Sequence, residues 1–521
     1  MKNPLPRACA ILVACAASLP AGGAVTDAKV SGGAVQGKAT NGVAAFKGIP
    51  FAAPPVGALR WKEPRPAAAW TGIRRTIAFA PACMQQAALG KSAHALPGYS
   101  EDCLYLNVWT PAADAVERLP VMVWIPGGGF AGGRTSNELF DGSRLAEKGV
   151  VVVSVAYRVG AFGFLAHPEL SRESGAASGN YGLQDIIAGL KWVKENIDSF
   201  GGDPRNVTIF GESAGGIAVS MLAASPAAKV HFDKAISQSG GSFAPSTESD
   251  EGEQNVPTLA LAESRGTAFL AKLAARDIAA ARALPADAIQ QAQGKGWGAF
   301  WPVDDGVVLP GDQYLLYSRG QFNDTPVLLG WNSDEGALFV SERVTSAEFE
   351  QQMRALYGER ADRILAANPH ATDAEATRAA RNVVRESYFG WPTWTWARLQ
   401  SKVGKGAAFV YYFDHRTPES PDGASHGDEI AYVFRNLSGP DGAAPRAEDV
   451  AMSELLSSYW VNFARAGDPN GPGLPPWPAF TGQHPLVLFI DAAPGARPVP
   501  NLPGLEALDA YYASRRAPAQ P

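Results

Sequence analysis

The segment VTIFGESAGG (207–216) places a serine between two glycines, directly after an apolar run and just before the helix-like stretch GIAVSMLAAS (216–225). G-x-S-x-G between a strand and a helix is the sequence pattern of a nucleophile elbow. Gly211 and Gly215 suit such a turn because side chains there would clash with the neighbouring strand and helix. The pattern predicts that Ser213 is a nucleophile at a helix N-terminus, which favours developing negative charge. The alternative is an ordinary glycine-rich turn.

Apolar runs on both sides of this segment indicate the fold class. VMVWI (121–125) and VVVSVAY (151–157) lack polar alternation, as strands buried on both faces do. DIIAGLKWVKENI (185–197) repeats apolar residues at helical spacing and is followed by GGDP. Strands that alternate with helices predict an α/β fold with a large, mostly parallel central sheet flanked by helices. Further strands are expected at 207–210, 234–240, 325–331 and 408–414.

Two long segments interrupt this alternation. Residues 245–300 and 340–400 are rich in alanine and charged residues, and we expect them to form helical insertions or a cap over the sheet. The chain has 521 residues but carries no repeat and no low-complexity linker. We therefore expect one domain over residues 25–521.

The composition gives no sign of a nucleic-acid partner. The formal net charge is −6 and no basic stripe is present, which argues against nucleic-acid binding. After the N-terminus, no apolar run approaches the length that spans a bilayer as a helix. We expect a protein without a membrane span, and a monomer is the favoured oligomeric state.

The N-terminus has the features of a secretory signal. A short positive region precedes the apolar residues 8–19, and small residues follow up to Ala24, which predicts a cleaved signal over residues 1–24 and an exported, periplasmic or secreted protein. The stretch LVAC (12–15) also resembles a lipoprotein box, which would place a lipid on Cys15. Cleavage would leave Cys83 and Cys103, an even pair for which an oxidising compartment favours a disulfide.

A serine hydroxyl needs a base to act as a nucleophile. In hydrolases with a nucleophile elbow, the chain order is serine, then acid, then histidine. His426 lies in the glycine-flanked loop GASHGDE, shortly after the strand expected at 408–414, where the carboxyl end of a strand would deliver a base. His415 is closer to that strand, and we interpret it as a hydrogen-bonded loop residue. Asp334 and Glu335 both follow a buried strand, and spacing alone does not choose between them as the acid.

The glycine-rich stretch WIPGGGFAGG (124–133) follows a strand and exposes consecutive backbone N–H groups. It matches the oxyanion loop of esterases. We predict that Gly128 and Gly129, together with the N–H of Ala214 after the nucleophile, stabilise an oxyanion. The alternative is a flexible turn with no link to the serine.

Taken together, these motifs resemble the type-B carboxylesterase family, the cholinesterase-like α/β-hydrolases, over nearly the whole chain after the signal. The resemblance implies an α/β-hydrolase fold and hydrolysis of carboxylic esters through an acyl-serine intermediate, with no metal and no cofactor. The segments that carry it include FKGIPFAAPPVGALRW (46–61), SEDCLYLNVWTP (100–111), VSVAYRVGAFGFLA (153–166), GNYGLQDIIAGLKWVKENIDSFGGDPRNVTIFGESAGG (179–216), PVDDG (302–306), SDEGALF (333–339), SHGDEIAYVF (425–434) and YWVNFARAGDPN (459–470).

The resemblance also implies roles for single residues. It makes Glu335 the catalytic acid and His426 the base, and it pairs Cys103 with Cys83. Glu212 and Ser239 match positions that help to order the site, although each is equally well explained as a buried hydrogen-bonding residue.

The chain departs from true cholinesterases between the paired cysteines. Residues 84–102 contain no tryptophan, the residue that holds a quaternary ammonium by cation–π attraction in those enzymes. An exported bacterial esterase of the p-nitrobenzyl-esterase kind fits better. Phe300 and Trp301 are candidates for the acyl pocket, and the aromatic stretch YFGWPTWTW (388–396) is a candidate gorge wall or simply core. Alternatives are a lipase, an esterase specialised for a bulky ester, and a non-catalytic binding protein.

Overall fold

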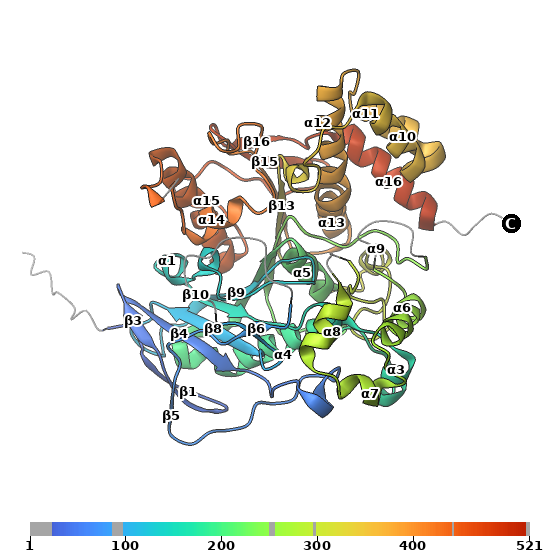
Figure 1. The fold of residues 1–521 in the computed structure, drawn as a ribbon. Coiled ribbons are helices and arrows are strands. Elements are labelled where there is room, and N and C mark those ends of the chain that lie inside the picture. Colours follow the sequence, from blue (N-terminus) through green and yellow to red (C-terminus); the bar gives the residue numbers. More distant parts are fainter. Residues whose placement is uncertain (1–22, 86–96, 250–255, 295–297, 440–441, 517–521) are drawn as a thin grey trace, which may run out of the picture.

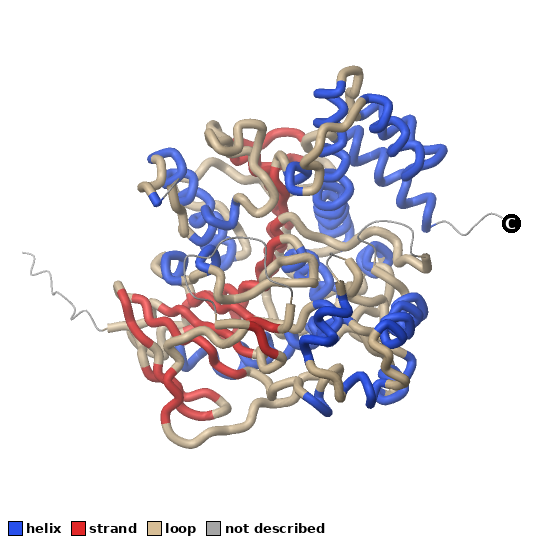
Figure 2. The backbone as a smooth tube through the Cα atoms, in the orientation of Figure 1, coloured by secondary structure: helices blue, strands red, loops and turns tan. Residues whose placement is uncertain are grey.

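The computed structural model describes residues 23–85, 97–249, 256–294, 298–439 and 442–516. Most of the predicted signal, including Cys15, therefore lies outside the described residues. Within these ranges the structure is built on one large mixed sheet with helices on both sides, as Figure 1 and Figure 2 show.

The large sheet has eleven strands in the described part of the chain, in the order β16-β15-β14-β13-β12-β11-β9-β10-β8-β4-β3. Its centre, from β10 to β15, is parallel throughout, which confirms the predicted mostly parallel sheet. The strands are β3 (Lys38–Thr40), β4 (Val43–Pro50), β8 (Tyr105–Thr110), β9 (Leu119–Ile125), β10 (Val151–Val155), β11 (Gly202–Glu212), β12 (Lys234–Gln238), β13 (Val327–Asn332), β14 (Ala408–Phe413), β15 (Leu486–Ile490) and β16 (Gly495–Pro498).

Both edges of this sheet are antiparallel, and sequence reasoning did not predict them. β8 pairs antiparallel with β10, β4 with β8 and β3 with β4, while β16 closes the other edge against β15. These strands are short or polar on one side, so they lack the continuous apolar runs that identified the central strands.

The side chains of the central strands divide between two cores. In β9, Val121, Val123 and Ile125 belong to one core and Met122 and Trp124 to the other, because successive side chains point to opposite faces of a strand. The first core is completed by helices α4 (Tyr181–Asn196), α5 (Ala214–Ala224) and α13 (Trp391–Val403), and the second by α1 (Ser143–Ala146), α14 (Glu429–Phe434) and α15 (Ala447–Ala466).

The two long segments between strands are helical, as predicted. The first contains α6 (Leu259–Lys272), α7 (Ile278–Arg282) and α8 (Ala286–Gln293), at the lower right of Figure 1, and these helices form a small core together with residues such as Trp61, Phe162 and Tyr181. The second contains α10 (Ser346–Tyr357), α11 (Ala361–Ala367), α12 (Asp373–Arg385) and α13, at the upper right. A turn of π-helix, η7 (Glu386–Gly390), joins α12 to α13.

Candidate active site

The turn between β11 and α5 is strained and closely packed. Ser213 has φ 56° and ψ −127°, a conformation that side chains other than glycine rarely adopt. A Cβ on Gly215 would lie 2.0 Å from the carbonyl oxygen of Ile125 in β9, and a Cβ on Gly211 would lie 2.6 Å from the backbone of Gly215. Backbone atoms therefore fill the space that a side chain would need at Gly211 and Gly215, as predicted from the sequence.

His426 and Glu335 come from neighbouring strand ends. Glu335 begins the 3-10 helix η5 (Glu335–Leu338) just after β13, and His426 lies in the loop between β14 and α14. The His426 Nδ1 atom is 2.5 Å from Glu335 Oε2, and the Glu335 carboxylate is fully buried while His426 is partly buried. Asp334, the alternative acid, lies 3.6 Å from the guanidinium of Arg381 instead.

The Glu335 carboxylate is fixed from its other side as well. Its Oε1 atom accepts hydrogen bonds from the Ser239 hydroxyl at 2.6 Å and from the Asn332 N–H at 2.7 Å. These donors hold the carboxylate in one orientation, and through it the imidazole ring of His426. Ser239 therefore contacts Glu335 directly.

A second carboxylate faces the other ring nitrogen. The Nε2 atom of His426 is 3.2 Å from Oε1 of Glu212, the residue before Ser213. Burial lowers the pKa of His426, but the nearby charges of Glu212 and Glu335 outweigh it and raise that pKa to about 9. Burial raises the pKa of Glu212 to about 8.

Glu429 is a third buried carboxylate that sequence reasoning did not single out, although it lies in the quoted SHGDEIAYVF segment. Gln238 Nε2 donates to its Oε1 at 2.9 Å and Asn332 Nδ2 to its Oε2 at 2.6 Å. Burial raises the pKa of Glu429 to about 7. The only signal in the sequence was its position three residues after His426.

Aromatic rings cover the imidazole. The Phe389 ring stacks on His426 with 4.6 Å between ring centroids, and Phe339 lies at 5.8 Å. Phe389 lies in the π-helix η7, a wider turn that often marks functional sites. Phe389, Trp391 and Trp396 are all buried in the first core, so this aromatic stretch packs as core, and Phe389 also stacks on the imidazole.

The glycine-rich loop after β9 lies against the serine turn. A Cβ on Gly127 would be 2.6 Å from the Glu212 carbonyl oxygen and 3.1 Å from the Ser213 Cβ. Gly128 and Gly129 have φ of 119° and 60°. Within the described ranges, their N–H groups and that of Ala214 donate to no protein acceptor. All three are therefore available to a ligand.

The structure places the two pocket candidates differently. The Trp301 ring packs edge-on against Phe130, the residue after Gly129, with 4.8 Å between centroids. The Phe300 ring instead packs against Phe269 of α6. Trp301 is thus the nearer of the two to the glycine-rich loop.

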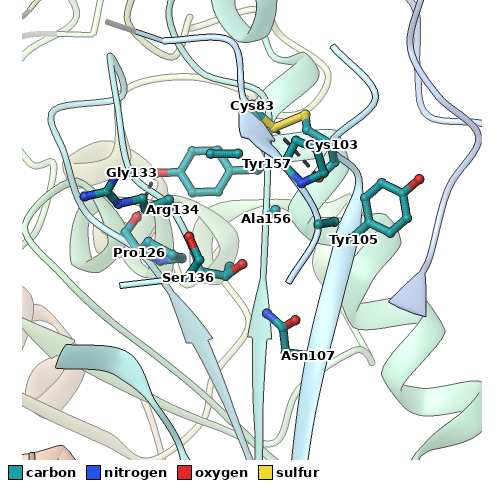
Figure 3. Close-up of a pocket in the computed structure, with 14 residues that line it drawn as sticks. Cys83, Cys103, Tyr105, Asn107, Pro126, Gly133, Arg134, Ser136, Ala156 and Tyr157 are labelled. Carbon is teal, nitrogen blue, oxygen red and sulfur yellow. Dashed lines mark hydrogen bonds between the residues drawn. A yellow bond between two sulfur atoms is a disulfide. The ribbon is translucent and has the colours of Figure 1, made fainter. Parts of the chain in front are cut away.

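Cys83 and Cys103 form a disulfide, as predicted. Figure 3 shows that it lines one small cavity together with Pro126 and Gly133 of the glycine-rich loop. None of the helices among the described residues combines the length and the hydropathy that a membrane span requires. The same ranges contain no group of three His, Cys, Asp or Glu side chains that could hold a metal ion.

The fold and this site define an α/β-hydrolase. The structure matches a solved PNB esterase with a TM-score of 0.80 at 34% sequence identity, over 93% of this chain and 99% of that chain. The fumonisin B1 esterase of Sphingopyxis macrogoltabida is 38% identical over 506 residues, covering 91% of this chain and 89% of that protein. The para-nitrobenzyl esterase of Bacillus subtilis is 36% identical over 473 residues, covering 88% and 94%.

A sequence model described as "Carboxylesterase family" matches residues 24–501. The chain belongs to the carboxylesterase family, which confirms the resemblance found in the sequence. It is a carboxylic ester hydrolase.

The carboxylate of Glu212 should control the pH at which His426 becomes neutral. Glu212→Gln removes a charge that raises the pKa of His426, so the neutral ring should persist to lower pH. We expect the acid limb of the kcat/KM profile to move to lower pH by about one unit or more. ¹⁵N NMR of labelled histidine should report the same shift.

A matched control is Glu195→Gln, on the exposed side of α4. It should leave the acid limb where it is. An acid limb that stays in place or rises in Glu212→Gln would contradict the assignment of the raised pKa to this carboxylate.

Proposed function

We propose that this esterase works through Ser213 as nucleophile, His426 as general base and Glu335 as the group that orients His426. The observation that carries the proposal is the hydrogen bond between Glu335 and His426 Nδ1, which leaves Nε2 facing the carboxylate of Glu212, the residue next to Ser213 in the chain. A carboxylate in that position fixes the tautomer and stabilises the imidazolium that forms during reaction.

The oxyanion is assigned to three backbone N–H groups, those of Gly128, Gly129 and Ala214. Support comes from their lack of protein acceptors in the described part of the chain and from the contact between Gly127 and the serine turn. Donors that are fixed before the reaction stabilise the developing charge without reorganisation.

The reaction then proceeds in two halves. Ser213 attacks the ester carbonyl as His426 accepts the hydroxyl proton, and the alcohol leaves with that proton. Water then attacks the acyl-serine with His426 again as base, which releases the acid and restores the serine. Ser239 and Glu212 do not react in this scheme, since they act on Glu335 and His426 respectively.

Ser213→Ala should lose at least about 10⁴-fold in kcat because the nucleophile is gone. Glu335→Gln should cost less, because it removes an orienting charge and leaves both reacting groups in place. Hydrolysis of p-nitrophenyl acetate and covalent labelling by an organophosphate measure both effects.

Ser220→Ala is the matched control, because Ser220 lies in helix α5, just after Ser213, and in the described part of the chain its hydroxyl bonds to the Ile217 carbonyl oxygen and to Gln313. It should retain wild-type turnover and labelling. Normal turnover in a folded Ser213→Ala protein would rule out the proposed nucleophile, and with it the assignment of the base.

For the substrate we propose small to medium carboxylic esters, in line with the likeness to para-nitrobenzyl esterase. A second candidate is a bulky ester, favoured by the likeness to a fumonisin B1 esterase. Trp301 should limit the acyl side, because it packs on the residue that follows Gly129.

Trp301→Leu should shift the preference among p-nitrophenyl esters from acetate toward longer acyl chains by about 10-fold in relative kcat/KM. The same panel should include bulky polycyclic esters and fumonisin B1. Phe300→Leu is the control, with a smaller shift expected because Phe300 faces α6. An unchanged chain-length profile in Trp301→Leu would remove this residue from the pocket, while wild-type preference for the bulky esters would favour the second candidate.

We also propose that the protein is exported with loss of residues 1–24. The disulfide between Cys83 and Cys103 supports an oxidising compartment. Intact mass and N-terminal sequencing of the periplasmic or secreted protein should give a chain that begins near Val25. A chain that retains Met1 would contradict export by cleavage, and a lipid on Cys15 would indicate an anchored protein instead.

A further inference from the structure

The glycine-rich loop folds back on itself, so its return half holds its first half. The Gly128 carbonyl oxygen accepts hydrogen bonds from Ala131 N–H at 3.1 Å and Gly132 N–H at 3.0 Å. A Cβ on Gly133 would lie 2.3 Å from the Gly127 carbonyl oxygen. Any displacement of Gly133 would therefore be passed directly to Gly127 and Gly128.

In the described part of the chain, three residues outside this loop hydrogen-bond to it. The Tyr157 hydroxyl donates to the Pro126 carbonyl at 2.8 Å, and the Gly160 N–H donates to the Phe130 carbonyl at 2.6 Å. The third contact, at Gly133, is made by a side chain from a distant part of the sequence.

That side chain is Gln85. Its Nε2 donates to the Gly133 carbonyl at 2.7 Å, and its Oε1 accepts from the Gly133 N–H at 2.9 Å. Nε2 also donates to the Cys83 carbonyl at 3.0 Å. The amide thus pairs with Gly133 through both its donor and its acceptor, as a neighbouring strand would.

Gln85 is only 3% exposed, so water offers no easy replacement for these bonds. The backbone of Gln85 is held in place as well. It lies two residues after Cys83, whose disulfide to Cys103 lines the same cavity as Gly133 in Figure 3. The pairing partner of Gly133 is therefore itself fixed to the body of the protein.

We propose that Gln85 is a positioning residue for the oxyanion N–H groups. It touches neither substrate nor reacting atoms, and it acts through Gly133 on the placement of Gly128 and Gly129. The proposal rests on the assignment of the oxyanion hole above. Misplacement of such donors weakens binding of the transition state more than binding of the ester, because the charge develops only in the transition state.

Gln85→Met keeps the length of the side chain but removes all three hydrogen bonds. We expect kcat to fall by about 10- to 100-fold, since misplacement of catalytic groups by about 1 Å has effects of this size, while KM changes little. The inhibition constant of a trifluoromethyl ketone, which forms an oxyanion on the serine, should rise in parallel.

Gln400→Met is the matched control. Gln400 is a buried glutamine whose Nε2 donates to Asp324 and to two carbonyl oxygens, far along the chain from the serine turn. It should lower the Tm as Gln85→Met does but leave kcat and the ketone inhibition constant at wild-type values. Equal kcat in Gln85→Met and Gln400→Met would overturn the proposal.

Gln85→Glu provides a second variant of the same size. It keeps the acceptor for the Gly133 N–H but sets an oxygen against the carbonyl groups of Gly133 and Cys83, so kcat should again fall at unchanged KM. A Gln85→Met protein that fails to fold, beside a folded Gln85→Glu protein with wild-type kcat, would also overturn the proposal. Ser213→Ala in the same series distinguishes failure of this inference from failure of the proposed function. Turnover in Ser213→Ala would refute the proposed function. If Ser213→Ala is inactive but the Gln85 variants have wild-type kcat, only the inference about Gln85 is refuted.

Discussion

The close approach of the serine turn to strand β9 is the constraint on which the rest of the site depends. Gly215 has no room for a side chain beside the Ile125 carbonyl, and Gly211 has none beside Gly215. Because the turn lies this close, the loop that follows Ile125 emerges directly beside Ser213. The glycine-rich loop and the serine turn are therefore parts of one packing arrangement, in which a methyl group at either glycine would force backbone to move.

The second feature of the site is a cluster of buried carboxylates, whose desolvation costs free energy that other contacts have to offset. Glu212, Glu335 and Glu429 are all buried near one imidazole, and burial disfavours every charged carboxylate. The three carboxylates differ in their hydrogen-bond partners. Glu335 accepts two fixed donors besides His426 Nδ1, and Glu429 is bound by Gln238 and Asn332. Glu212 faces the imidazole Nε2, and burial raises its pKa to about 8, while burial raises the pKa of Glu429 to about 7.

Much of this arrangement could be predicted because it is encoded in short segments. The serine turn and the central strands follow from local glycines and apolar runs. Spacing did not separate Asp334 from Glu335, because adjacent residues at a strand end point to different sides, one toward Arg381 and the other toward His426. The resemblance to a family favoured Glu335, and the hydrogen bond is to that residue. The stacking of Phe389 on His426 and the pairing of Gln85 with Gly133 join residues 37 and 48 positions apart, and no local pattern encodes such contacts.

Two residues of the serine turn and the glycine-rich loop have a strained backbone. Ser213 and Phe130 both have positive φ, 56° and 53°, which is unfavourable for residues with a side chain. Such conformations persist only where the surroundings over-determine them. For Phe130 the surroundings are the Gly160 N–H on its carbonyl and the Trp301 ring against its side chain. For Ser213 they are the Gln238 carbonyl, which accepts its N–H at 2.9 Å, and the start of α5. These contacts come from segments that lie far apart in the sequence, which explains why a local motif predicts this site but does not by itself build it.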